Sequence, residues 1–346
     1  MPTTIKDIAA RLGISHITVS RALRGFPYVN EELRRRIHET AREMNYRPNA
    51  LARGLKGMRT QLVGLIIPDL LNDFYASVAT LLQATLSREG YRVLLGVSGN
   101  DPACELDYLH AMREERVEGV IWAPWSWHPE IVKEYQTVRV PLIQFGRRVS
   151  DQLDAVLPDD ERGAEEATKH LMQLGHRRIG LIVGPTELSS GASRLSGFQR
   201  ALQAGGIALD DSLIKIGRFD RRWGREAAQE LLDLPSPPTA ILAASSELLI
   251  GALQVLDARR VAVPDRMSLV GFSNPDWYSL WRPPITTMAF STEEAASLAV
   301  DTILDQIRER QSGNHANPCT VRYRLQLLIR GSTASPPPAP SPFKGS

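Results

Sequence analysis

Residues 4–23 read TIKDIAARLGISHITVSRAL, and this stretch predicts two short helices joined by a glycine turn. Thr4 is a suitable N-cap for the first helix, which ends at Gly13. Ser15 can cap the second helix in the same way. Apolar residues recur in both helices at the spacing of one helical face. These inward positions are Ile5, Ile8, Ala9 and Leu12 in the first helix, and Val19, Ala22 and Leu23 in the second.

A third helix is predicted from Asn30 to a point before Pro48, because proline does not fit inside a helix. Two short helices braced by a third describe a helix-turn-helix. The pattern alone also fits an arbitrary helical bundle. The inward residues of the third helix are Leu33, Ile37, Ala41 and Met44, and the outward residues of the second are His16, Ile17, Ser20, Arg21 and Arg24.

Charge separates this N-terminal region from the rest of the chain. Residues 1–60 hold 12 Lys and Arg against 5 Asp and Glu, a net charge of +7, whereas the remaining residues carry a net charge of −5. A module this basic usually binds a polyanion, and double-stranded DNA is the polyanion that a helix-turn-helix binds. The alternative is a solvated basic surface without a partner.

Beyond residue 60, short apolar runs alternate with amphipathic helical stretches. This alternation predicts an α/β body with parallel sheets that are covered on both faces. About 270 residues of it are too many for one sheet, so we expect two doubly wound subdomains with a ligand cleft between them. The predicted strands are residues 61–67, 92–97, 119–122, 141–145, 179–183, 240–243 and 268–271.

Several classes of function lack their usual residues. Cys104 and Cys319 are the only cysteines, too few for a disulfide framework or a zinc site, and this fits a cytoplasmic protein. The first 15 residues lack the apolar core of a signal peptide, and no apolar stretch approaches 18 residues, so we expect no membrane segment. No Walker A, G-x-G-x-x-G or H-E-x-x-H sequence appears. We therefore expect no enzyme activity, no cofactor and no metal.

Motifs along the whole chain resemble those of LacI-type bacterial repressors, over about residues 2–331. The resemblance implies a homodimer whose body is similar to the periplasmic sugar-binding proteins. A hinge helix would join it to heads that bind a pseudo-palindromic operator, under the control of a small-molecule effector in the cleft. The matching stretches are TIKDIA (4–9), GISxxTVSRAL (13–23), MNYRPNALAR (44–53), LVGLIIP (62–68), GVI (119–121), HLxxxGHRRI (170–179), RxxGF (194–198) and PPITT (283–287).

With this resemblance the chain divides into four regions. We expect a helix-turn-helix head over residues 1–47, a hinge helix and linker over 48–60, and an effector-binding and dimerisation body over 61–330. Residues 331–346 are expected to form a disordered tail, because the run from Ser335 onward is rich in Pro, Ser and Ala.

The resemblance also assigns DNA contacts. Arg21 can donate two hydrogen bonds to a guanine in the major groove, His16 can read an acceptor, and Ile17 can only make apolar contacts. The alternative for Ile17 is a contact in the core of the head. The residues 49–56 match the hinge helix, in which Leu55 is the wedge that enters the minor groove. Thr4, Ser15, Thr18, Tyr46 and Asn49 match positions that hold phosphates, and Ala52 and Arg53 lie in the matching hinge segment.

For the effector pocket, the resemblance points to an aromatic ring at Phe219 that stacks on the ligand and to Arg194, which holds its polar groups. Relatives commonly carry carboxylates or amides at positions matching Gly146, Ser246 and Ser273. Their absence predicts a pocket that is less acidic than usual and that prefers a sugar acid or phosphate, unless Glu247 lies in it. The remaining predicted pocket residues are Phe74, Trp125, Arg147 and Ser190.

The leading prediction is a sequence-specific transcriptional regulator, most often a repressor. The alternative is a soluble sugar-binding protein without a DNA role, which would need a signal peptide and no basic head. An enzyme on a doubly wound fold is a third reading, and no catalytic constellation supports it.

Overall fold

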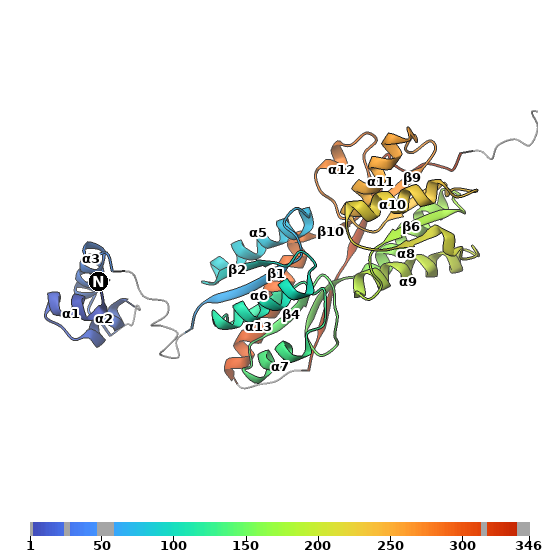
Figure 1. Cartoon of the computed structure of the whole chain (residues 1–346). Helices are drawn as coiled ribbons and strands as arrows, with labels where there is room; N and C mark the ends of the chain where they lie inside the picture. The colour runs from blue at the N-terminus through green and yellow to red at the C-terminus, as the bar shows by residue number, and fades with distance from the viewer. Residues whose placement is uncertain (1–2, 24–27, 47–58, 313–316, 338–346) are drawn as a thin grey trace, which may run out of the picture. The chain divides into compact units, whose positions relative to one another are not determined.

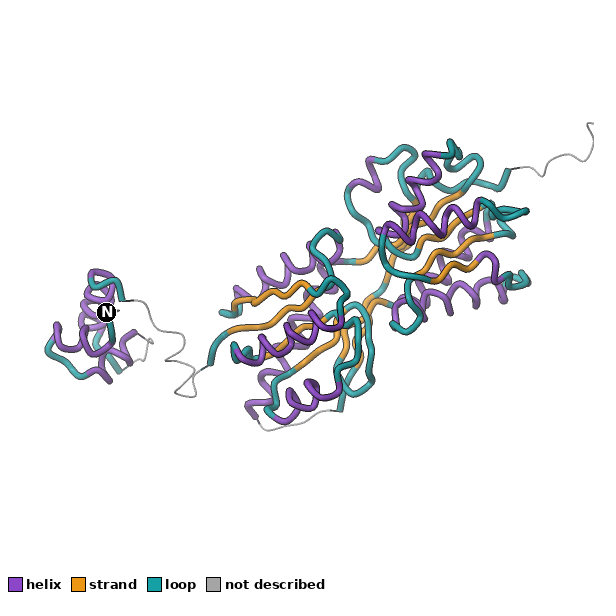
Figure 2. Tube along the Cα trace, viewed as in Figure 1, coloured by secondary structure: helices purple, strands orange, loops and turns teal. Residues whose placement is uncertain are grey.

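The computed structural model describes residues 3–23, 28–46, 59–312 and 317–337. The chain divides into two compact units, residues 1–60 and residues 61–346. Figures 1 and 2 show the first unit as a cluster of helices and the second as two sheets, each covered by helices.

The first unit contains the three predicted helices, α1 (Ile5–Leu12), α2 (His16–Leu23) and α3 (Glu31–Glu43). The caps are also as predicted. The Thr4 hydroxyl accepts a hydrogen bond from the backbone N–H of Asp7, and the Ser15 hydroxyl accepts one from Thr18 at 3.1 Å. Gly13 ends α1 in the left-handed conformation, with φ 68°. The buried core of this unit includes Ile8, Val19, Ala22, Val29 and Ile37.

Six parallel strands form the sheet of the first subdomain, in the order β11–β5–β4–β3–β1–β2. One face packs on α5 (Asp73–Arg88) and α13 (Thr292–Ser312), and the other on α6 (Pro102–Glu114) and α7 (Pro129–Thr137). The strands are β1 (Leu62–Ile67), β2 (Arg92–Val97), β3 (Gly119–Trp122), β4 (Leu142–Phe145), β5 (Ala155–Pro158) and β11 (Thr320–Tyr323).

The second subdomain has the sheet order β12–β10–β9–β8–β6–β7, in which only β12 is antiparallel to its neighbour. Helices α8 (Asp160–Gln173) and α9 (Ser189–Ala204) pack on one face, and α10 (Arg221–Leu232) and α11 (Ser246–Ala258) on the other. The short helices are η1 (Asp211–Leu213) and α12 (Trp277–Leu280). The strands are β6 (Ile179–Val183), β7 (Ile214–Ile216), β8 (Ala240–Ala243), β9 (Ser268–Phe272), β10 (Thr286–Phe290) and β12 (Leu325–Leu328).

The chain passes between the two subdomains three times, from β5 to α8, from β10 to α13, and from β11 to β12. The prediction of two doubly wound subdomains is therefore confirmed, although neither is one continuous stretch of sequence. Among the described residues, no helix is long and apolar enough to span a membrane.

The predicted disordered tail begins too early. Residues 331–337 follow β12 and pack on the second subdomain, where Ser332 is fully buried. Its hydroxyl donates to the carbonyl of Leu269 at 2.6 Å and accepts from the backbone N–H of Thr286 at 2.8 Å. The carbonyl of Ala334 accepts a hydrogen bond from the ring of His176 at 2.9 Å. The prediction from composition was wrong for residues 331–337, because small residues can pack where their polar groups find hydrogen-bond partners. Residues 338–346 lie outside the described residues.

Candidate functional site

A pocket lies between the two subdomains of the second unit, at the carboxyl ends of their parallel strands. Ligands of open α/β sheets bind at this edge, because the loops that follow the strands converge there. The first subdomain contributes loops after β1, β2 and β4, and the second contributes loops after β7, β8 and β9. Lining residues from these loops and from the start of α11 are Asp69, Asn100, Gly146 and Arg147 on one wall, and Phe219, Ser245, Ser246, Glu247 and Ser273 on the other.

The wall of the second subdomain contains a buried ion pair. The Nε of Arg194, on α9, donates to Oδ1 of Asp160, the first residue of α8, at 2.9 Å. The same guanidinium donates to the carbonyl of Ala244 at 2.5 Å. Burial raises the pKa of Asp160 to about 6, against the lowering effect of Arg194. The charge of Arg194 is thus balanced inside the protein.

Aromatic rings surround the same arginine. Its guanidinium carbon lies 4.7 Å from the ring centroid of Phe272, 5.8 Å from that of Phe290 and 5.9 Å from that of Phe219. Phe290 also packs on Phe74 of the first subdomain, with the ring centroids 5.1 Å apart. These rings form an apolar floor on which the planar or cyclic face of a ligand can stack.

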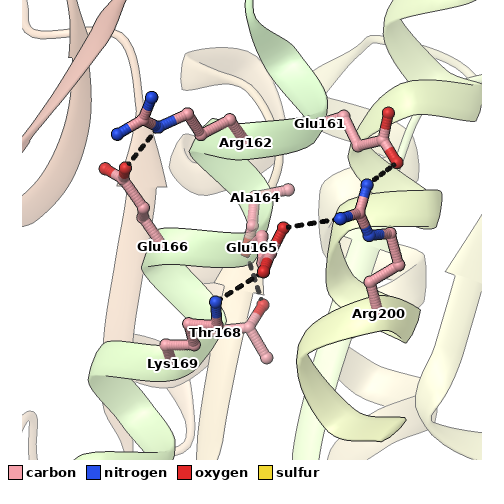
Figure 3. A network of polar contacts seen from close by, with 8 residues as sticks. All are labelled: Glu161, Arg162, Ala164, Glu165, Glu166, Thr168, Lys169 and Arg200. Atoms are coloured by element: carbon pink, nitrogen blue, oxygen red, sulfur yellow. Dashed lines mark hydrogen bonds and ion pairs between the residues drawn. The ribbon is translucent and has the colours of Figure 1, made fainter. Parts of the chain in front are cut away.

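Helices α8 and α9, which carry the ion pair, lie unusually close together. Gly197 has no side chain at their contact, and a Cβ atom there would collide with the backbone carbonyl of Glu161. Figure 3 shows Arg200 of α9 between Glu161 and Glu165 of α8, at 2.8 and 3.7 Å. Within α8, Arg162 pairs with Glu166 and Lys169 pairs with Glu165, and the Thr168 hydroxyl donates to the carbonyl of Ala164.

The wall of the first subdomain contains a second buried arginine, Arg147, whose surroundings differ from those of Arg194. Arg147 is 4% exposed, and its Nη2 donates to Oδ1 of Asn100 at 2.7 Å. Its guanidinium carbon lies 5.3 Å from the ring centroid of Trp125. Its Nε is buried without a hydrogen-bond partner, and it forms no ion pair within the part of the chain that the structure describes. This cation is held in place but not neutralised.

A phenol lies between the two walls. Tyr323, at the end of β11, lines the pocket, and its hydroxyl is buried with no hydrogen-bond partner among the described residues. Burial raises its pKa well above the ordinary value, so the hydroxyl keeps its proton and can donate. The pocket can therefore bind a small ligand through stacking on its rings and through one arginine that has no ion-pair partner among the described residues.

In the first unit, the outer face of α2 is exposed. His16, Ile17 and Arg21 are exposed, with Ile17 at 51%, so Ile17 is not a core residue of the head. Thr4 and Ser15 are exposed as well, Thr18 is half-buried, and the half-buried Tyr46 packs against the core. The predicted contacts Asn49, Ala52, Arg53 and Leu55 lie outside the described residues.

Comparison with known proteins agrees with both units. The family model "Bacterial regulatory proteins, lacI family" matches residues 4–49, and "Periplasmic binding protein-like domain" matches residues 168–333. The HTH-type transcriptional regulator DegA of Bacillus subtilis (strain 168) is 33% identical over 298 residues, which cover 85% of this chain and 88% of DegA. The chain belongs to the LacI family.

Two further transcriptional regulators match nearly the whole chain. The HTH-type transcriptional repressor CytR of Escherichia coli (strain K12) is 31% identical over 335 residues, which cover 96% of this chain and 97% of CytR. The solved structure of a transcriptional regulator CelR–cellobiose complex has a TM-score of 0.72 and 27% identity, and the match covers 95% of this chain and 99% of that one. These relatives are regulators and not enzymes.

The structure brings the predicted pocket residues of this LacI-family member together. Trp125 lies in the adjoining recess, which Asn100, Phe219 and Glu247 also line. The other predicted residues line the pocket itself: Phe74, Arg147, Ser190, Arg194, Phe219, Ser246 and Ser273. Their roles toward a ligand stay predictions.

The prediction of a pocket less acidic than usual had one stated exception, the presence of Glu247, and Glu247 does line the pocket. Asp69 and Glu247 line the pocket, and Asp160 lies behind it as the partner of Arg194. Glu247 is itself paired with Arg221, at 2.6 Å. The sequence argument also missed Asn100 and Tyr323. Their positions after β2 and at the end of β11 are the available signal, since strand ends meet at the ligand edge.

Proposed function

We propose that this protein is a repressor that binds a pseudo-palindromic operator as a homodimer and responds to a small-molecule effector, a sugar or sugar acid, in the cleft. Its family membership and the presence of both units in one chain support this function. The observation that carries it is the exposed polar face of α2 in a basic head, next in sequence to a body with a two-walled pocket. A bacterial protein that binds operator DNA acts in the cytoplasm, where that DNA lies.

In this proposal α2 lies in the major groove. Arg21 donates to guanine O6 and N7, His16 reads an acceptor and Ile17 contacts a thymine methyl group. Phosphate contacts by Thr4, Ser15, Thr18, Tyr46 and Asn49 orient the head without choosing a sequence. Residues Ala52, Arg53 and Leu55 follow in the hinge, and Leu55 enters the minor groove at the operator centre.

The effector acts through the two walls. Phe219 and Phe74 contact its ring, Arg194, Ser190, Ser246 and Ser273 meet its polar groups from the second subdomain, and Trp125 and Arg147 meet it from the first. The three connections between the subdomains are where a closing motion would bend the chain. Control of DNA binding then requires that the effector bind one relative orientation of the subdomains more tightly than the other.

Footprinting of the purified protein on the DNA upstream of its own gene tests this function. We expect protection of a site with two half-sites, and a change in protection when sugars and sugar acids are added. Arg21→Ala should weaken binding to the protected site by about 10- to 100-fold and binding to random DNA much less.

Arg35→Ala is the matched control, because Arg35 lies on α3 and already pairs with Glu32 and Glu39. It should leave the footprint unchanged. A purified protein that binds sugars but protects no DNA would be a sugar-binding protein without a DNA role. If Arg21→Ala weakened binding to the protected site and to random DNA equally, Arg21 would contact phosphate and not a base.

A further inference from the structure

The two arginines that line the pocket have different electrostatic surroundings. Arg194 is balanced by Asp160 on the same wall. Across the pocket, Glu247 is balanced by Arg221. Among the described residues, Arg147 has the neutral Asn100 as its one hydrogen-bond partner, and the face of Trp125 lies beside it. A buried cation without a counter-ion is costly unless a ligand supplies the missing charge.

A buried carboxylate holds Trp125 in position beside Arg147. Glu105 of α6 is 0% exposed and accepts three hydrogen bonds from the loop after β3. The donors are the backbone N–H of Trp125 at 2.7 Å, the backbone N–H of Ser126 at 3.1 Å, and Nε2 of His128 at 2.9 Å. The loop that carries the indole is therefore anchored to the first subdomain, and the guanidinium lies between this indole and the Asn100 amide.

One acidic group on the same wall bears on the chemistry of the ligand. Asp69 lines the pocket, and its Oδ1 accepts from the backbone N–H of Leu71 at 2.7 Å. The carboxylate keeps further acceptor capacity, which suits the hydroxyl groups of a ligand. The wall thus offers a cation for an anionic group and a carboxylate for hydroxyl groups.

We propose that Arg147 is the anion-binding residue of the effector site, that the effector is a polyhydroxylated acid or phosphate, and that Glu105 is a positioning residue that acts through Trp125. This inference rests on the proposed effector function. It assigns the anionic group to the wall of the first subdomain, whereas Arg194, whose charge is balanced by Asp160, meets uncharged polar groups of the ligand. The guanidinium of Arg147 lines the pocket, and a carboxylate or phosphate oxygen of the effector would bind to it.

Inorganic phosphate is the first probe, because it carries the charge without requiring knowledge of the sugar. Thermal unfolding of the full chain is measured against phosphate concentration, with potassium chloride at matched ionic strength. We expect a saturable rise in the unfolding midpoint of the wild type. Arg147→Gln should weaken the phosphate dependence by about 10- to 100-fold.

Arg148→Gln is the matched control, because this neighbouring arginine pairs with Asp151 and does not line the pocket. It should retain the phosphate response. A midpoint that phosphate does not change in the wild type, or changes equally in Arg147→Gln, would overturn the proposal. Matched pairs then separate the two sources of negative charge: gluconate against glucose for a carboxylate, and glucose 6-phosphate against glucose for a phosphate.

The positioning role of Glu105 has its own readout. Trp125 fluorescence is isolated as the difference between the wild type and Trp125→Phe, and we expect phosphate to change it. Glu105→Gln should shift this emission and weaken phosphate binding by less than Arg147→Gln does. Unchanged emission and binding in Glu105→Gln would remove Glu105 from the proposal.

Operator footprints of the same variants separate this inference from the proposed function. Arg148→Gln should protect the operator and respond to anions like the wild type, whereas operator protection by Arg147→Gln should respond poorly to anions. If the wild type protects no DNA, the repressor function fails whatever the result with phosphate. If it protects DNA but binds no anion, only the role of Arg147 fails.

Discussion

The two walls of the pocket differ in whether their charged side chains have ion-pair partners. On the second subdomain, Arg194 and Glu247 each have a partner, Asp160 and Arg221 respectively. On the first subdomain, Arg147 is equally buried but has no carboxylate partner among the described residues. The paired wall is complete without a ligand and contributes shape and stacking. A negatively charged group of a ligand would neutralise Arg147 on the unpaired wall. We therefore expect the wall of the first subdomain to select the ligand.

The largest expected effect comes from breaking the paired wall. Arg194→Met leaves Asp160 buried without its cation, and we expect a loss of about 3–5 kcal/mol in the free energy of unfolding at pH 7.5. Urea unfolding of the full chain measures it. The double variant Arg194→Met/Asp160→Leu should recover most of the loss, because it removes both charges. A double variant as unstable as the single one would show that packing, and not charge, dominates there.

The pH dependence of stability tests the same pair. Burial raises the pKa of Asp160 from 3.8 to about 6, so the folded protein holds this proton more tightly than the unfolded chain. The resulting stabilisation is fully present below about pH 4 and is lost as the pH rises through 6, up to about 3 kcal/mol.

Asp160→Asn provides the reference, because the carboxylates of Glu161 and Glu165 have lowered pKa values and act in the opposite direction. The wild type should gain stability relative to this variant between pH 7.5 and pH 4.5 in urea unfolding. Parallel stability profiles would mean that Asp160 titrates normally and that the pair is more hydrated than its burial indicates.

The close contact between α8 and α9 gives a smaller effect. Gly197→Ala places a methyl group against the carbonyl of Glu161, so the helices must separate and the ion pair they carry must shift. We expect a loss of about 1–3 kcal/mol in the free energy of unfolding. Ser193→Ala on the same helix adds no atom and should be nearly neutral. A Gly197→Ala protein as stable as the wild type would mean that the helices can move apart freely.

The smallest effect is expected on the unpaired wall. Arg147→Met keeps an apolar stem and removes a buried charge that forms no ion pair among the described residues. The free energy of unfolding should therefore stay within about 1 kcal/mol of the wild type. Chemical unfolding beside Arg194→Met makes the comparison direct. Equal losses in the two variants would erase the distinction between the walls.

Prediction from sequence succeeded where a local pattern carries the information. The three head helices follow from apolar spacing and from the caps Thr4, Ser15 and Asn30. Six of the seven predicted strands lie in the interiors of the sheets, and the seventh, β2, lies at an edge. The strands it missed include β7, β11 and β12, which have three or four residues and exposed positions. Their pairing partners, and not their own sequences, place them in a sheet.

By itself, the sequence determined the family, the helical head, the doubly wound body and several of the residues that line the pocket. Only the tertiary structure decided which charged side chains in that pocket are neutralised by a neighbouring side chain. Arg194 and Asp160 are 34 residues apart in the chain, and their pairing arises where α9 packs on α8. Both Arg147 and Arg194 read as free cations in the sequence, because a charge is neutralised by what folding brings next to it.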